Sequence, residues 1–168
     1  MAERREGEID LPFDPGTIGD GAIVFIGQVR SAWRERAECP KNMAAARETG
    51  LRASLYINEP YRPGLDGLER ASHAIVLTWL DRSARNLVVQ KPRHADRPSG
   101  VFALRSPARP NPIGLHVCRI LSVDHQSGVV ELDAIDVLDE TPLLDIKPYF
   151  ASTDSIPDAI RADREAAA

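Results

Sequence analysis

A proline-rich loop holds the most unusual combination of polar side chains in the sequence. Residues 105–114 are Arg-Ser-Pro-Ala-Arg-Pro-Asn-Pro-Ile-Gly, with three prolines in six residues. Because proline fixes φ and donates no backbone hydrogen bond, the segment is expected to be a stiff loop that holds Arg105, Arg109 and Asn111 in set positions. Such loops commonly bind ligands. The structural alternative is that these arginines pair with acidic residues elsewhere in the chain.

The second unusual segment is acidic. Between residues 133 and 149, carboxylates alternate with apolar residues, which predicts that they lie at a strand end and in a loop and not on a solvated helix face. Such carboxylates can bind ribose hydroxyls or an ammonium group, or act as a general base. The spacing lacks the glycine and terminal glutamate of a calcium-binding loop, so we expect no metal. Salt bridges to the arginine-rich half of the chain are the alternative role.

Charge is distributed unevenly along the 168 residues, although the formal net charge is only −4. Residues 82–119 contain eight Lys or Arg and one acid, whereas residues 120–168 contain eleven acids and three bases. The basic part suits contact with phosphates. The N-terminus is charged and is followed by no long apolar run, and the two cysteines are far apart. We therefore expect a cytoplasmic protein with free thiols and no membrane segment.

Short β-rich runs dominate the pattern, and crossover helices of a parallel sheet are missing. The predicted fold is mainly β, a small antiparallel β-barrel with a few short helices. Residues 1–20 are expected to form an arm or tail, residues 21–152 the barrel domain, and residues 153–168 a C-terminal helix or tail. Asn42 is expected to cap a short helix that Gly50 ends. Strands are predicted at residues 22–29, 51–57, 73–80, 86–90, 100–104, 115–123 and 129–135.

Two long motifs give the sequence a family resemblance. GVFALRSPARPNPIG at residues 100–114 and DVLDETPLLDIKPY at residues 136–149 resemble the TsaA-like (TrmO) family. IGQVRS at residues 26–31 and GLERASHAIVL at residues 67–77 fit the same family in the same order. The resemblance implies a β-barrel, usually a homodimer, that uses S-adenosylmethionine. It further implies an enzyme that methylates N6 of a modified adenosine in the tRNA anticodon loop.

The resemblance also implies site residues. Cofactor contacts are expected at Asn42, Met43, Ala44, Ser83, Ala84, Arg105, Leu115, Asp133, Ala134, Ile135 and Asp136. Near the transferred methyl group, Asp139, Asp145 and Tyr149 are catalytic candidates and Lys147 lies beside them, with no choice made among them. Arg109, Asn111 and Lys147 are candidates for substrate binding. Catalysis then rests mainly on aligning the acceptor nitrogen with the methyl carbon.

Two departures from the family pattern leave an alternative open. The turn usually written DGTP is Asp139-Glu140-Thr141-Pro142 here, so a glutamate stands where the family has glycine. The chain also stops soon after the expected barrel, whereas longer tRNA-modifying members carry a C-terminal domain. The alternative functions are a non-catalytic S-adenosylmethionine-binding or RNA-binding module, and a methyltransferase for another small substrate.

Overall fold

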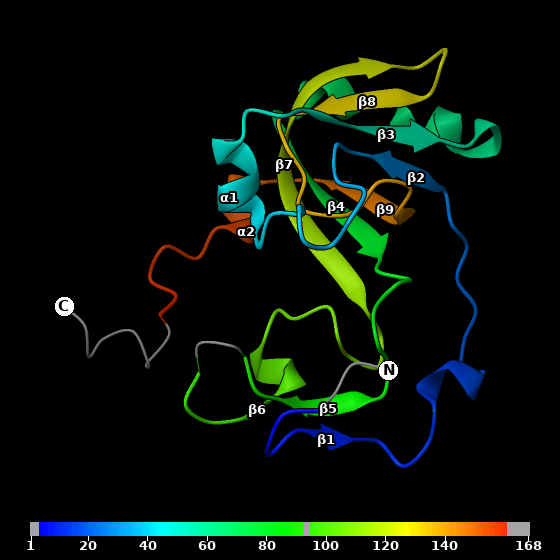
Figure 1. Cartoon of the computed structure of the whole chain (residues 1–168). Helices are drawn as coiled ribbons and strands as arrows, with labels where there is room; N and C mark the ends of the chain where they lie inside the picture. The colour runs from blue at the N-terminus through cyan, green and yellow to red at the C-terminus, as the bar shows by residue number, and fades with distance from the viewer. Residues whose placement is uncertain (1–3, 93–94, 161–168) are drawn as a thin grey trace.

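A closed antiparallel barrel forms the body of the molecule (Figure 1). The computed structural model describes residues 4–92 and 95–160. Each barrel strand pairs with the next and the last pairs with the first, in the order β2-β3-β8-β7-β4-β9. The predicted fold class is therefore confirmed. The strands are β2 (Gly27–Arg30), β3 (Ala53–Ile57), β4 (His73–Trp79), β7 (Ile113–Asp124), β8 (Val129–Leu132) and β9 (Pro142–Pro148).

Alternation along the strands builds the core. In β4 every second residue is buried, and the inward residues of β3 and β8 meet them inside the barrel. The largest fully buried side chains include Leu55, Val76, Leu132 and Leu143. Burying apolar side chains of this size stabilises the fold by about 1.5–3 kcal/mol each. The barrel is thus a packed support, and ligands must bind outside its core.

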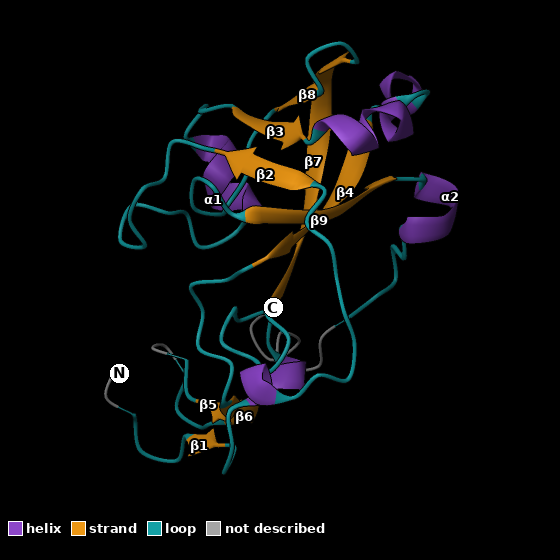
Figure 2. Cartoon of the chain, turned by 90° about the vertical axis from the view of Figure 1, so that its right-hand side faces the viewer, coloured by secondary structure: helices purple, strands orange, loops and turns teal. Residues whose placement is uncertain are grey.

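A second, three-stranded sheet lies at one end of the barrel (Figure 2). It consists of β1 (Ile9–Asp10), β5 (Leu87–Gln90) and β6 (Ser99–Gly100), in the order β1-β5-β6. The strands β5 and β6 belong to residues 80–112, which we call the excursion because they leave the barrel after β4 and return at β7. Trp79 lies opposite Ile113 in the β4-β7 pair, so the two ends of the excursion are neighbours.

Helices are short. The α-helices are α1 (Met43–Glu48) and α2 (Ala151–Asp154), and the 3-10 helices are η1 (Pro15–Thr17), η2 (Glu59–Leu65), η3 (Leu68–Arg70) and η4 (Val101–Ala103). The Asn42 side chain accepts a hydrogen bond from the Ala45 N–H at 2.9 Å, and Gly50 follows the helix with φ of 68°. The predicted cap and stop of α1 are confirmed. Within the described residues, no helix is long and apolar enough to cross a membrane.

Several predicted elements differ from the structure. The arm at residues 1–20 contributes β1, because Leu11 N–H donates to the Asn86 carbonyl at 2.6 Å and Ile9 lies opposite Val89. Residues 22–26 form no strand: β2 begins only at Gly27, the first residue of its ladders with β3 and β9. Of the strand predicted at residues 100–104, only Gly100 lies in a strand, at the end of β6, and residues 101–103 form η4. Within the described residues the last helix is α2, which begins before the C-terminal segment predicted at residues 153–168, and residues 161–168 of that segment lie outside the described part.

Candidate functional site

A pocket of about 900 Å³ lies between the barrel, α1 and the excursion. One wall is the outer side of the barrel at Leu77, Ile113 and Leu115. The second comes from the loop that leads into α1, and the third from the polar residues of the excursion. The loop between β8 and β9 closes the remaining side with residues 136–138. The site is therefore assembled from segments far apart in the sequence.

The barrel wall supplies apolar surface. Residues of β7 alternate in burial, so Ile113 and Leu115 point outward while Gly114 and His116 lie on the buried side. Leu77, Leu80, Val137 and Leu138 add further apolar groups to the pocket lining. Pockets with mostly apolar walls and a few placed polar groups bind small organic ligands. A flat ring system can lie against this wall.

The loop into α1 is fixed to the barrel by polar contacts. The Trp33 indole N–H donates to the Ile135 carbonyl at 2.9 Å, and the Ser31 hydroxyl donates to the Val137 carbonyl at 2.8 Å. Cys39 is buried in the pocket wall, and this burial raises the pKa of its thiol. Burial raises the pKa of Cys118, inside the barrel, from 9.0 to about 12. Neither thiol is therefore activated as a nucleophile.

The excursion is held rigid by its own arginines. Arg85 lies over the Trp79 ring, 5.3 Å from the centroid, and its Nε donates to the Pro110 carbonyl at 2.8 Å. The Arg109 guanidinium donates to the Leu104 carbonyl at 3.0 Å, and the Arg105 guanidinium to the Leu115 carbonyl at 3.0 Å. Each guanidinium has five N–H donors. Arg105 and Arg109 therefore keep donors for a ligand.

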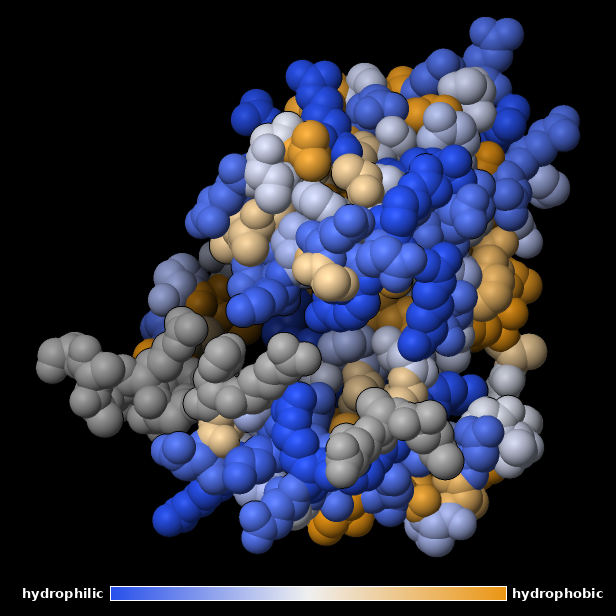
Figure 3. Space-filling view, viewed as in Figure 1, coloured by the Kyte–Doolittle hydropathy of each residue, from blue (hydrophilic) through white to orange (hydrophobic). Residues whose placement is uncertain are grey.

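The pocket carries an excess of positive charge. Among the described residues, its lining contains two carboxylates, Asp81 and Asp136. Facing them are six cationic side chains: Arg36, Lys41, Arg47, Arg82, Arg105 and Arg109. Such a site favours a ligand with anionic groups, and its two acids offer places for an ammonium or for hydroxyls. Figure 3 shows that hydrophilic residues cover much of one face of the molecule, with hydrophobic residues in smaller groups between them.

Most residues predicted from the motifs line this pocket. They are Asn42, Met43, Ala44, Ser83, Arg105, Leu115 and Asp136 of the cofactor set, with Arg109 and Asn111 of the substrate set. The structure thus brings together residues from four separate stretches of sequence. Within the part of the chain that is described, it shows no group of three His, Cys, Asp or Glu placed to hold a metal ion.

Four residues of the predicted cofactor set lie outside the pocket lining. Ala134 and Ile135 are buried in the barrel. Asp133 accepts hydrogen bonds from the Arg119 backbone N–H at 2.8 Å and from Arg47 at 3.0 Å, so it joins α1 to the barrel. The Ala84 carbonyl accepts a hydrogen bond from the Arg109 backbone N–H at 3.1 Å. Local packing accounts for all four positions.

The predicted catalytic group is also placed elsewhere. Asp139 is buried beneath the loop into α1, where it accepts the Ser31 N–H at 3.0 Å and pairs with Arg34. Asp145 pairs with Lys147 at 2.7 Å on β9, and Tyr149 follows the end of that strand. None of the four lines the pocket.

His116, Arg36 and Arg82 line the pocket but were absent from the predicted site. In the sequence, the one signal for His116 is that a histidine stands between apolar neighbours in a strand. The structure shows that this histidine lies on the buried side of β7. The two arginines belong to no motif, and only the folding of their loops brings them to the pocket.

Comparison with known proteins places the chain in a family. Residues 28–155 match the family described as the tRNA-methyltransferase O N-terminal domain. The chain belongs to this family. A crystal structure of TrmO from Pseudomonas aeruginosa has 32% sequence identity and a TM-score of 0.67, over 83% of this chain and 60% of that one. The fold of most of this chain is thus similar to that of a solved TrmO structure.

Two curated relatives bear names that refer to a cofactor. The first is "Probable S-adenosyl-L-methionine-binding protein VirR" of Rhizobium radiobacter, 39% identical over 77% of this chain and 71% of that protein. The second, a "Probable S-adenosyl-L-methionine-binding protein" of Archaeoglobus fulgidus, is 39% identical over 80% of this chain. This chain spans 35% of the length of the second relative and 60% of the TrmO chain.

Proposed function

We propose that this protein is an S-adenosylmethionine-dependent methyltransferase and that its cofactor binds in the pocket beside α1 and the excursion. The observation that carries the proposal is the meeting, in one pocket, of apolar wall, cationic donors and Asp136, from the segments that the family motifs mark. The names of the two relatives and of the family support the same ligand.

The chemistry of the donor set fits the cofactor. The outward side chains Leu77, Ile113 and Leu115 suit an adenine ring. Arg105 suits the carboxylate of the methionine part, because guanidinium and carboxylate pair in a bidentate geometry. Asp136 suits the ribose hydroxyls or the ammonium group. When bound, S-adenosylmethionine supplies an electrophilic methyl group.

We further propose that the acceptor is N6 of a modified adenosine in the tRNA anticodon loop. The excess of cationic groups at the pocket supports an acceptor that carries phosphates. Arg109 and Asn111 stand on the rigid excursion at the pocket and are proposed to position the acceptor base. A protein that acts on tRNA in this way is expected in the cytoplasm.

We place the proton acceptor of the reaction at Asp81. This carboxylate is exposed at the pocket, next to Arg82, whereas Asp139, Asp145 and Tyr149 lie outside the lining. A base within hydrogen-bond reach of the acceptor nitrogen is needed only to remove its proton. Asp81→Asn is expected to retain cofactor binding and to lower methyl transfer by about 100-fold.

A homodimer is also proposed. Large apolar side chains outside the pocket lining are exposed on the described part of the chain, including Phe102 at 83%. Exposed apolar groups of this size commonly mark an interface. Sedimentation analysis of the wild type and of Phe102→Asp tests this expectation, and a monomeric wild type would rule it out.

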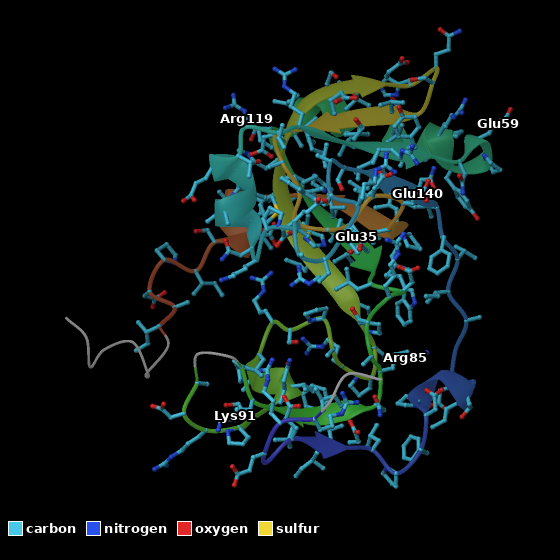
Figure 4. All side chains as sticks on the ribbon, viewed as in Figure 1. Glu35, Glu59, Arg85, Lys91, Arg119 and Glu140 are labelled. Atoms are coloured by element: carbon cyan, nitrogen blue, oxygen red, sulfur yellow. The ribbon has the colours of Figure 1, made fainter. Side chains whose placement is uncertain are left out.

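The first experiment is calorimetric titration of the purified protein with S-adenosylmethionine. Saturable binding is expected, and Arg105→Ala is expected to weaken it by about 10-fold or more. Arg119→Ala is the matched control, because this exposed arginine lies at the opposite end of the barrel from Arg85 and Lys91 of the excursion (Figure 4). Failure of the folded wild type to bind the cofactor would overturn the proposal.

The second experiment measures methyl transfer from labelled cofactor to bulk tRNA of a strain that lacks its own enzyme of this kind. Transfer to adenosine N6 supports the proposed acceptor. Cofactor binding without transfer to any tRNA would leave the protein as a cofactor-binding module.

A further inference from the structure

His116 connects the inside of the barrel to the pocket through two hydrogen bonds. It lies on β7, is only 5% exposed and belongs to the pocket lining. Its Nδ1 lies 2.7 Å from Oδ1 of Asp136, and its Nε2 lies 3.0 Å from Oγ1 of Thr78. Both ring nitrogens are therefore engaged, and the ring has one orientation.

The partners assign the proton positions. An ionised carboxylate only accepts hydrogen bonds, so Nδ1–H of His116 donates to Asp136. In the neutral ring Nε2 then accepts, and the Thr78 hydroxyl donates to it. Thr78 is fully buried on β4, so this chain of donors is anchored in the rigid barrel wall.

Gly114 makes room for this arrangement. A Cβ at position 114 would lie 2.3 Å from Oγ1 of Thr78 and 2.5 Å from Nε2 of His116. Any other residue there would push the two groups apart. The hydrogen bond between Thr78 and His116 occupies the space that a side chain at position 114 would need. This explains the glycine at the end of the proline-rich loop.

Asp136 needs such a holder because it shares the pocket with an excess of cationic side chains. The pocket lining contains six cationic side chains, and a mobile carboxylate would turn toward one of them. A neutral imidazole fixes Oδ1 without cancelling the negative charge, whereas an arginine in the same place would cancel it. Oδ2 of Asp136 has no hydrogen-bond partner among the described residues, and the side chain remains 17% exposed.

We propose that His116 is a positioning residue that presents the charged Asp136 carboxylate to the hydroxyl or ammonium groups of the cofactor. This inference rests on the proposed function. His116 itself need not touch the ligand: it sets the direction of Oδ2, and Thr78 and Gly114 set the direction of His116.

Two variants of His116 separate positioning from general support of the fold. In His116→Asn the amide nitrogen takes the place of Nδ1 and still donates to Asp136, whereas in His116→Gln it takes the place of Nε2. With S-adenosylmethionine as the probe, calorimetry is expected to show a Kd within about 3-fold of the wild type for His116→Asn. The Kd of His116→Gln is expected to rise by about 10- to 100-fold, the size of a lost charge-assisted hydrogen bond.

A double-mutant cycle gives the readout that a merely structural role does not produce. In the Asp136→Asn background, His116→Gln is expected to change the Kd by less than about 2-fold, because its effect passes through Asp136. Equal losses for His116→Gln in both backgrounds, or equal losses for the Asn and Gln variants, would overturn the proposal. Thermal melts show whether each variant is folded.

The ring tautomer tests the arrangement without any cofactor. In NMR spectra of protein labelled with ¹⁵N-histidine, His116 is expected to carry its proton on Nδ1, and Asp136→Asn is expected to disturb that signal. A proton on Nε2 alone would overturn the positioning role. If the wild type does not bind S-adenosylmethionine, the proposed function and the ligand of Asp136 fail, while this spectrum still decides the role of His116.

Discussion

Asp139 shows how one side chain can hold a loop in place. It is 3% exposed, accepts the Ser31 N–H and pairs with Arg34, with Nε of Arg30 at 3.6 Å. Through these contacts it ties the turn before β9 to the loop that forms one pocket wall. The same residue opens the DETP turn of the family motif, so a structural role suffices to explain the acid at this position.

Asp139→Asn is expected to lower the free energy of unfolding by about 2–4 kcal/mol, because it removes the charge that holds buried hydrogen bonds and an ion pair. Urea denaturation measures the loss. Asp145→Asn is the control: its carboxylate is partly exposed and pairs with an exposed Lys147, and we expect a change below about 0.5 kcal/mol. Equal losses in the two variants would contradict the role assigned to Asp139.

Glu140 is the one non-glycine residue of the described chain with positive φ, at 66°. Left-handed backbone costs a residue with a Cβ about 1 kcal/mol, and glycine avoids this cost. Its ion pair with Arg30, at 2.9 Å, is exposed and worth little. We expect Glu140→Gly to exceed Glu140→Ala in stability by about 1 kcal/mol in thermal melts, since both lose the ion pair and only glycine relieves the backbone. Equal melting temperatures would show that the turn is unstrained.

At the scale of elements, the pairing of β2 with β3 depends on the absence of a side chain. A Cβ at Gly27 would lie 2.0 Å from the Tyr56 carbonyl oxygen. Gly27→Ala is therefore expected to cost about 3 kcal/mol, by forcing the strands apart. Gly64→Ala serves as the control, because no heavy atom lies within 4 Å of its added Cβ. The comparison needs only chemical denaturation curves, and similar midpoints for the two variants would refute it.

The elements that could be predicted from the sequence are those with local signals. The apolar run of β4 and the Asn42 cap of α1 are signals carried by neighbouring residues, and both elements were predicted correctly. The strand β9 has prolines at both ends and charged residues between them. It is a strand because it pairs with β2 and β4 on either side, contacts that no local pattern reveals. The strand predicted at residues 100–104 was wrong for the converse reason. The local apolar run suggested a strand, but residues 101–103 fold as η4.

The same distinction holds for the candidate site. Arg105, Asn111 and Asp136 belong to long family motifs, and all three line the pocket. His116 and Arg82 could not be predicted, because they reach the pocket through strand pairing and loop folding. Asp139 shares a motif with site residues, but packing against the loop into α1 gives it a different position.

At the scale of the whole molecule, the N-terminal arm is joined to the excursion through Glu8. The backbone N–H groups of Arg5 and Lys91 donate to its carboxylate, both at 3.0 Å, and they hold the pKa of Glu8 below its ordinary value of 4.5. Because the pKa of Glu8 is lowered, its ionised carboxylate stabilises the docked arm at pH values above its ordinary pKa. This stabilisation is lost as the pH falls through the lowered pKa. Acid is therefore expected to release the arm.

An NMR titration between about pH 6 and pH 3 tests this expectation. In the wild type, the Lys91 amide signal is expected to shift with a midpoint below that of an unperturbed glutamate. In Glu8→Gln the shift should be absent, because nothing titrates at that position. A midpoint at the ordinary value would mean that the arm does not depend on Glu8.

The excursion begins and ends at adjacent points of the barrel. Leu80 N–H donates to the Pro112 carbonyl at 2.8 Å, so a short turn between β4 and β7 would close the barrel equally well. Yet residues 80–112 carry Ser83, Arg105, Arg109 and Asn111, one full wall of the pocket. This wall of the pocket is therefore an insertion between two paired strands, so the residues that line it can differ without any change in the strand order of the barrel.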